Sequence, residues 1–295
     1  MATSTATRLA SSPLRLRAQL VQVLDAVDRS VDTVIRRPHP PAPLLHDLHR
    51  DMRRLVGGLS VWAQVLPKRD ATKLELLIPR ARRLSRLVGR VRDKDVTIAL
   101  FSRYAQETDD AEEAARILRF LMRLRDDART GRELLRAFLR TERERGLFAE
   151  IGAFVTRPPA RGPSERLRRL LAEEAATRHG RVTRARERAR RRPSPERLHR
   201  LRIRVRQLRH FADLVAEVAP ESVGRVPLVL RRLQSRLGRL HDLDVALGTL
   251  DPDLHGTAWA RRLYNQRRRM RRQARVALAE LSRVAKAQRA KARAP

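Results

Sequence analysis

Apolar residues recur every three or four positions through most of this chain, and that spacing predicts amphipathic helices. No stretch sustains the alternation of apolar and polar residues that is typical of strands, so the predicted fold class is all-α. Prolines and glycines divide the pattern into eight predicted helices: about 14–36, 43–66, 70–106, 107–144, 164–191, 194–218, 222–248 and 256–290. The helix over 107–144 is predicted as one piece or two. The clearest linker, Arg157 to Pro163, is rich in proline and separates two sets of four helices.

The predicted helix 194–218 carries two stripes of different character. Ser194-Pro195-Glu196 is a helix-start signature, with an N-cap hydroxyl, a proline at the first helical position and a carboxylate in the first turn. At 100° per residue, one apolar stripe must be buried: Leu201, Val205, Leu208 and Ala212. The neighbouring stripe, which we call the His/Arg ladder, consists of His199, Arg202, Arg206 and His210. Such a row of hydrogen-bond donors suits an anion with repeating charges.

The chain also repeats itself. A shift of 153 residues places His46 on His199, Arg53 on Arg206 and Pro67 on Pro220. Further on, a shift of 149 residues places Arg83 on Arg232, Arg90 on Arg239, Asp93 on Asp242 and Asp95 on Asp244. The offset changes in a turn between two helices, where a difference in length costs little. The repeat predicts two tandem four-helix bundles over 13–157 and 164–290, preceded by a disordered N-terminus at 1–12 and followed by a basic tail at 291–295.

Charge indicates the kind of partner. The 295 residues include 67 Lys and Arg against 33 Asp and Glu, for a formal net charge of +34. An excess of this size indicates a polyanionic partner, which is nucleic acid, polyphosphate or an anionic membrane surface. Hydrophobic residues make up 42% of the chain, which is enough for a packed core and excludes a purely basic disordered tail.

The same composition bears on location. The absence of cysteine excludes disulfides and thiolate chemistry and suits a reducing compartment. No window approaches a membrane span, and Arg15 and Arg17 interrupt the apolar stretch from Leu14 to Leu24, which makes it a poor signal peptide. We therefore expect a soluble, cytoplasmic protein.

Both halves carry motifs in the same order. Leu198 to Arg206, followed by Leu233-Gln234 and Leu237 to Val245, resembles the CHAD domain, the conserved histidine α-helical domain. His46-Asp47-Leu48, Arg53-Arg54-Leu55 and Leu84 to Val96 resemble its first half. The resemblance covers about residues 14–290 and implies two four-helix bundles related by a pseudo-twofold, with a basic groove or cavity that binds inorganic polyphosphate.

The first half departs from the family pattern at two positions. His49 stands where an arginine is usual three residues after the histidine, and Lys94 stands at the position of Leu243. In the second half, Gln207 occupies a position that is usually basic. The second half is therefore the stronger match.

The predicted function is non-catalytic binding of inorganic polyphosphate, with recruitment of the protein to polyphosphate granules. Arginine suits this task because its planar fork donates paired bonds to phosphate oxygens, and histidine adds a donor whose charge follows the ligand. The predicted binding residues are His46, Arg50, Arg53, Arg54, Arg83, Arg90, His199, Arg202, Arg206, Arg209, His210, Arg232 and Arg239.

The motif His241-Asp242-Leu243-Asp244 invites a second interpretation, because His-Asp pairs occur in metal phosphohydrolases. Its first copy reads Arg92-Asp93 and lacks the histidine, and both copies lie in a strongly basic context. A supporting role is favoured, in which acids pair with helix arginines and position the ladder: Asp93, Asp95, Asp242 and Asp244. No phosphate loop, Ser/His/Asp set or paired-carboxylate motif is present, so we expect no enzyme, no metal and no cofactor.

Nucleic-acid binding is the alternative function. The run from Arg267 to Arg272 and the basic tail would attract nucleic acid through charge alone. Aromatic residues make up only 3% of the chain, which is too few for the stacking platforms of single-strand binders. No zinc-finger or RRM-like signature is present.

Overall fold

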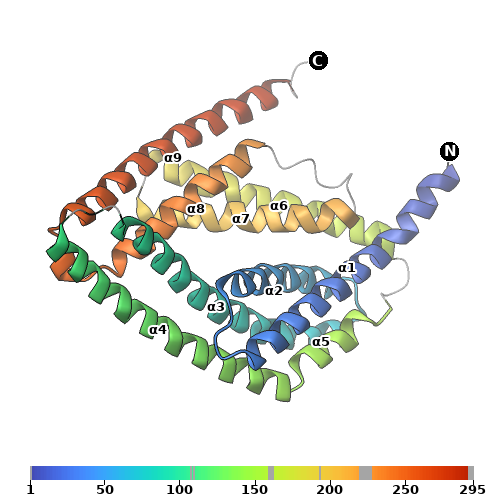
Figure 1. Cartoon of the computed structure of the whole chain (residues 1–295). Helices are drawn as coiled ribbons and strands as arrows, with labels where there is room; N and C mark the ends of the chain where they lie inside the picture. Colours follow the sequence, from blue (N-terminus) through green and yellow to red (C-terminus); the bar gives the residue numbers. More distant parts are fainter. Residues whose placement is uncertain are drawn as a thin grey trace. The chain divides into compact units, whose positions relative to one another are not determined.

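The computed structural model describes residues 2–106, 108, 110–158, 163–192, 194–218 and 228–291 (Figure 1). The helices are α1 (Ala2–Arg36), α2 (Ala42–Trp62), α3 (Lys68–Ala105), α4 (Ala111–Glu144), α5 (Leu147–Val155), α6 (Pro163–Arg191), α7 (Pro195–Val218), α8 (Leu228–Gly248) and α9 (Ala258–Lys291). A 3₁₀ turn, Pro252–Leu254, precedes α9. The described ranges contain no strand, and the all-α fold class is confirmed.

Two helices differ from the prediction. The first helix begins at Ala2 rather than near Leu14, so it extends into the segment predicted to be disordered; residues 1–12 contain no proline or glycine to prevent this. Helix α5 was not predicted as a separate element. Gly146, with φ 71°, separates it from α4, and its nine residues are too few to show a helical period. The predicted start of the seventh helix near residue 222 lies outside the described residues.

The chain forms two compact units, and neither is a continuous stretch of sequence. Unit 1 comprises 1–95, 125–176 and 210–224, and unit 2 comprises 96–124, 177–209 and 225–295. Four long helices, α3, α4, α6 and α7, therefore contribute residues to both units. The units do not coincide with the halves 13–157 and 164–290, so the tandem bundles remain a prediction from the sequence repeat.

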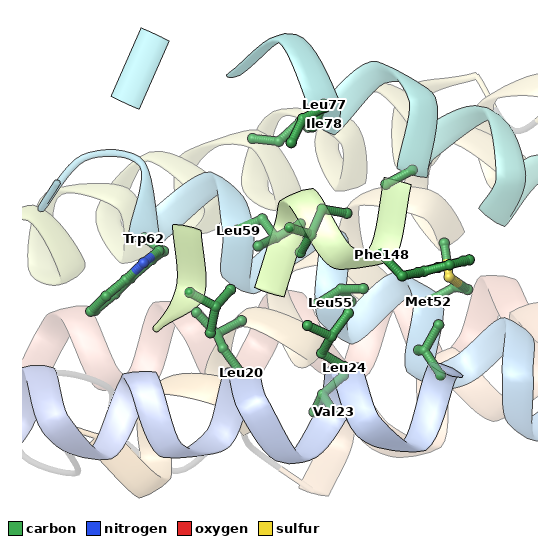
Figure 2. Packing of buried hydrophobic residues seen from close by; sticks show 14 of the residues in the cluster. Leu20, Val23, Leu24, Met52, Leu55, Leu59, Trp62, Leu77, Ile78 and Phe148 are labelled. Atoms are coloured by element: carbon green, nitrogen blue, oxygen red, sulfur yellow. The ribbon is translucent and has the colours of Figure 1, made fainter. Parts of the chain in front are cut away.

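The core of unit 1 is built from apolar faces of α1, α2, α3 and α5, with single turns of other helices (Figure 2). The stripe along α2 is fully buried: Leu48, Met52, Leu55, Leu59 and Trp62. The indole N–H of Trp62 donates to the backbone carbonyl of Phe154 at 3.0 Å and so links α2 to α5. Gly58 permits the close approach of α1, because a Cβ there would lie 2.4 Å from Cδ2 of Leu20.

Unit 2 has two apolar clusters. In the first, three residues of the predicted stripe of α7, Leu201, Val205 and Leu208, are buried together with leucines of α8 and alanines of α9. The second surrounds Trp259, whose ring lies 5.0 Å from that of Phe101, centroid to centroid. Glu113 accepts the backbone N–H of Trp259 at 2.6 Å, which satisfies one of the orphan donors at the start of α9. These clusters pack α8 against α9 and bury one face of α7, so the ladder residues lie beside the buried face.

Candidate anion-binding site

Unit 2 contains most of the His/Arg ladder. His199, Arg202 and Arg206 lie half-buried on α7 beside its buried stripe, and Arg209 is half-buried as well. The remaining ladder residue, His210, is half-buried in unit 1. Water screens a half-buried guanidinium less than an exposed one, so its contact with a phosphate oxygen is stronger. The structure therefore places a row of partly desolvated donors on one face of α7.

His199 meets His241 of α8 within unit 2. Their Nδ1 atoms are 3.0 Å apart and their ring centroids 4.6 Å apart. One Nδ1 must donate a proton and the other must accept it, so at least one of the two rings is neutral. His241 was considered in the sequence only as part of the His-Asp motif, and no sequence signal paired it with His199.

The electrostatic environment determines whether the His199 imidazole is neutral or protonated. Burial lowers the pKa of His199 below its ordinary value, the charges of Arg202 and Arg206 lower it further, and Asp244 opposes them. In the absence of ligand, His199 is therefore neutral at pH 7. A phosphate group placed against the ladder would reverse the balance, because negative charge favours the imidazolium form.

Asp244 is held by α9. It accepts a hydrogen bond from Nε of Arg267 and lies 3.7 Å from the guanidinium of Arg271. The run of arginines from residue 267 to 272 is thereby divided: two of its members face the carboxylate, whereas Arg268 and Arg272 are exposed.

Two of the other predicted supporting acids lie inside α3 and pair with arginines. Asp93 accepts from Arg92 at 2.7 Å, and Asp95 pairs with Arg132 of α4 within unit 1. Burial raises the pKa of Asp95, and the charge of Arg132 opposes this effect. Asp242 is half-buried on α8. Arg92, Arg132 and Arg267, which pair with Asp93, Asp95 and Asp244, come from α3, α4 and α9 and lie outside the predicted set of binding residues.

The predicted arginines of α8 are both exposed. Arg232 and Arg239 are seven residues apart and so lie on one face of the helix. Arg225, which would continue this series, falls outside the described residues.

Unit 1 contains the first-half counterparts, and their charges are more compensated. Arg50 donates to Asp47 at 2.7 Å and to Asp51 at 3.1 Å, and Arg54 lies 4.0 Å from Asp51. The hydrogen bond to Asp51 is the main reason that the pKa of Arg50 is raised. His46 is exposed at the start of α2 and Arg53 is half-buried.

On α3, the predicted residues Arg83 and Arg90 are exposed. The guanidinium of Arg83 lies over the ring of Phe138, 5.1 Å from its centroid. This cation–π contact orients one of the two arginines without neutralising it.

His49 has a packing role. Its Nδ1 lies 3.1 Å from the backbone carbonyl of Ser85, so Nδ1 carries the proton and donates. Gly89 lies against the same ring, and a Cβ at that position would be 2.6 Å from Cε1 of His49. The departure from the family pattern at residue 49 thus coincides with a tight contact between α2 and α3.

The described residues also limit the kinds of site and location to consider. No group of three or more His, Asp or Glu side chains among them is arranged to hold a metal ion. None of the described helices is both long and apolar enough to cross a membrane.

Comparisons with known proteins agree with this architecture. The CHAD domain from the plant Ricinus communis matches with a TM-score of 0.61 and 20% identity, over 90% of this chain and 91% of that one. PptA from Streptomyces chartreusis matches with a TM-score of 0.63 and 18% identity, over 92% of this chain and 98% of that one. No curated protein sequence is significantly similar to the chain.

The family model of the CHAD domain matches residues 15–251, which covers most of α1, all of α2 to α8 and both ladder motifs. Helix α9 follows the matched range, although it supplies the arginines that hold Asp244. On the strength of this match, the chain belongs to the CHAD domain family.

Proposed function

We propose that this protein binds inorganic polyphosphate at the His/Arg ladder of α7 and does not cleave it. The observation that carries the proposal is the row of half-buried donors formed by His199, Arg202 and Arg206. The family's link to polyphosphate supports the choice of ligand.

The spacing of the donors suits a linear polyanion. Residues three and four apart on a helix lie about 5–6 Å apart, so neighbouring arginines reach successive phosphates of one chain. Each guanidinium donates two parallel hydrogen bonds, and each contact releases counter-ions condensed on the polymer. Binding is therefore multidentate and strongly dependent on salt.

The two halves contribute unequally. In α2, Asp47 and Asp51 compensate Arg50, whereas the matching positions of α7 are Arg200 and Arg204. We expect the second half to supply most of the affinity and the predicted residues of the first half, including Arg53 and Arg90, to supply less.

Binding without turnover fits a protein that is recruited to polyphosphate granules in the cytoplasm. Incubation of the purified protein with polyphosphate and Mg²⁺ or Mn²⁺ should leave the chain length unchanged on gels. Phosphate release that stops on Asp242→Asn would contradict a purely binding role and would revive the metal interpretation of the His-Asp motif.

The test of the site is the double change Arg202→Ala and Arg206→Ala. Each lost charge-assisted contact costs about 1.5–3 kcal/mol, so long-chain polyphosphate should bind about a hundredfold more weakly or worse. The matched control is Arg268→Ala with Arg272→Ala, which removes the same charge from exposed positions of α9 at the same spacing.

The control also addresses nucleic acid. If α9 or the tail binds the polyanion, the α9 pair or a deletion of residues 286–295 should weaken binding more than the ladder change does. Competition between long-chain polyphosphate and duplex DNA at near-physiological salt then identifies the preferred ligand. Tighter binding of DNA would favour the nucleic-acid alternative.

A further inference from the structure

A pocket of about 480 Å³ lies between α6 and α7, entirely within unit 2. It is lined by six arginines with Ala185 among them: Arg181, Arg184 and Arg188 of α6, and Arg197, Arg200 and Arg204 of α7. Each helix contributes its three arginines at the same spacing of three and then four residues, which places them on one face. Two arginine rows thus face one shared space.

The two helices form an antiparallel hairpin. Residues 192–194 join them, Arg197 contacts the carbonyl of Arg188, and Arg178 contacts the carbonyl of Gln207. Residues later in α7 therefore lie beside residues earlier in α6, as in an αα-hairpin. This pairing brings the two rows together along their whole length.

The pocket is separate from the His/Arg ladder. At 100° per residue, its α7 arginines lie about 160° around the helix from His199, Arg202 and Arg206. It is also absent from the repeated pattern: the shift of 153 residues that aligns the two ladders places Leu44, Asp47 and Asp51 opposite the α7 row. The arginine pocket is thus a feature of the second half alone.

The described residues place no paired carboxylate against this positive charge. No carboxylate among the described residues forms a salt bridge with any of the six arginines; the nearby Glu187 is paired with Arg190 and Arg191 instead. The exposed Glu196 lies near Arg200, but the largest cause of its lowered pKa is its hydrogen bond to Ser194, and the charge of Arg200 is a lesser cause. Six guanidiniums around one space repel one another until an anion enters.

The α7 row is oriented by uncharged acceptors. Arg197 donates to the carbonyl of Arg192 at 3.1 Å, Arg200 donates through Nε to the carbonyl of Glu196 at 3.4 Å, and Arg204 donates to Oε1 of Gln207 at 3.0 Å. These bonds use one nitrogen of each side chain and leave its positive charge intact. Each guanidinium keeps further N–H groups for a ligand.

We infer that the α6–α7 pocket is a second anion site, which binds a compact oligophosphate with three or more phosphoryl groups. Arginine forks match phosphate oxygens, and no aromatic side chain lines the pocket to stack a nucleobase. The ligand is either a segment of a polyphosphate chain or a free oligophosphate, which share the same chemistry. The inference does not depend on the ladder, because the two sets of residues are disjoint.

The test is calorimetric titration of the full chain with tripolyphosphate. Arg184→Gln with Arg200→Gln removes one donor from each row and should weaken tripolyphosphate binding about a hundredfold. The charge-matched control, Arg268→Gln with Arg272→Gln, should change it less than about threefold. Circular dichroism confirms that each variant remains helical.

Two additional experiments test the nature of the contacts and the range of ligands. Arg184→Lys with Arg200→Lys keeps the charge but removes the forks, and an intermediate loss of affinity would support paired hydrogen bonds. Long-chain polyphosphate, titrated into the same variants, shows whether the pocket also accepts a polymer segment; weakening with either ligand supports the site.

The outcomes separate this inference from the proposed function. If the pocket variant binds both ligands as the α9 control does, the inference is wrong, whatever the ladder change does. If the ladder change leaves polyphosphate binding intact but the pocket change does not, the pocket is the main site and the proposal for the ladder fails.

Discussion

At the residue scale, the burial of His199 makes folding sensitive to pH. Burial and two neighbouring arginines lower the pKa of His199, so the folded protein resists protonation there. The unfolded chain takes up that proton near the ordinary value of 6.5. The folded state therefore loses stability relative to the unfolded chain in the acidic window below that value.

We predict that the melting temperature falls as the pH drops below about 6.5, because the unfolded state then binds more protons than the folded one. The loss should continue until the pH reaches the lowered pKa of the folded protein. Scanning calorimetry between pH 5 and pH 8 measures the effect. His199→Gln, which keeps a hydrogen-bonding group beside His241, should flatten this part of the profile, and an unchanged slope would place the titration elsewhere.

A second prediction at this scale concerns Gly89 and its counterpart in the repeat, Gly238. Gly89→Ala would force the hydrogen-bonded ring of His49 to move and should destabilise the protein by about 1–3 kcal/mol. No atom lies within 4 Å of a Cβ built on Gly238, so Gly238→Ala should be neutral or stabilising by up to about 1 kcal/mol. Urea unfolding of both variants gives the comparison. Equal changes in stability for the two variants would show that the His49 ring moves aside at little cost.

The burial of a single residue was predictable where its position along one helix determines which face it lies on. The buried stripe of α7 and the ladder beside it follow from helical spacing, and Leu201 and Val205 are buried as expected. The partner of His199 was not predictable, because it depends on how α7 meets α8. The same holds for His49, whose contact with Gly89 joins residues 40 positions apart.

At the element scale, α7 shows three faces: the buried stripe, the ladder and the row of arginines turned toward α6. Periodicity predicted the first two and the bounds of α7 itself. The third face could not be predicted from sequence. A row of arginines on one helix is usually a solvated surface, and it lines a pocket only when a second row packs opposite it. The short helix α5 could not be predicted, because a nine-residue apolar segment shows no distinctive helical period.

The α6–α7 hairpin should be strained by its own charge when no anion is bound. We predict that Arg184→Gln with Arg200→Gln raises the melting temperature at low ionic strength, because it relieves repulsion among the six guanidiniums. The gain should vanish in 1 M salt, where the screening length is about 3 Å. A melting temperature that falls equally at both salt concentrations would mean that these arginines stabilise the hairpin by packing.

At the scale of the whole molecule, the net charge of +34 provides a background attraction for any polyanion. Salt titration separates this background from the ladder. We predict that changing Arg202 and Arg206 to Ala reduces the slope of log K against log salt by about one for each arginine. The α9 control should alter the slope less. Equal slopes for all variants would show that polyphosphate is held by diffuse charge alone.

The global arrangement was the least accessible from sequence. The helical content and order follow from periodicity and breakers, and the family match covers α1 to α8. The compact units cut across the repeat, however, because α3 and α4 are each long enough to leave one unit and enter the other. A sequence repeat shows only which segments are similar. The division into compact units depends on which residues pack together, and long helices carry residues from one unit into the other.

That division has a practical consequence for dissecting the protein. Each compact unit is assembled from three separate stretches, so no single truncation or gene fragment contains one unit without segments of the other. A protease cut inside α4 or α7 would separate stretches of both units at once. Limited digestion should therefore yield either the nearly full-length chain or small peptides, without a stable half-sized product.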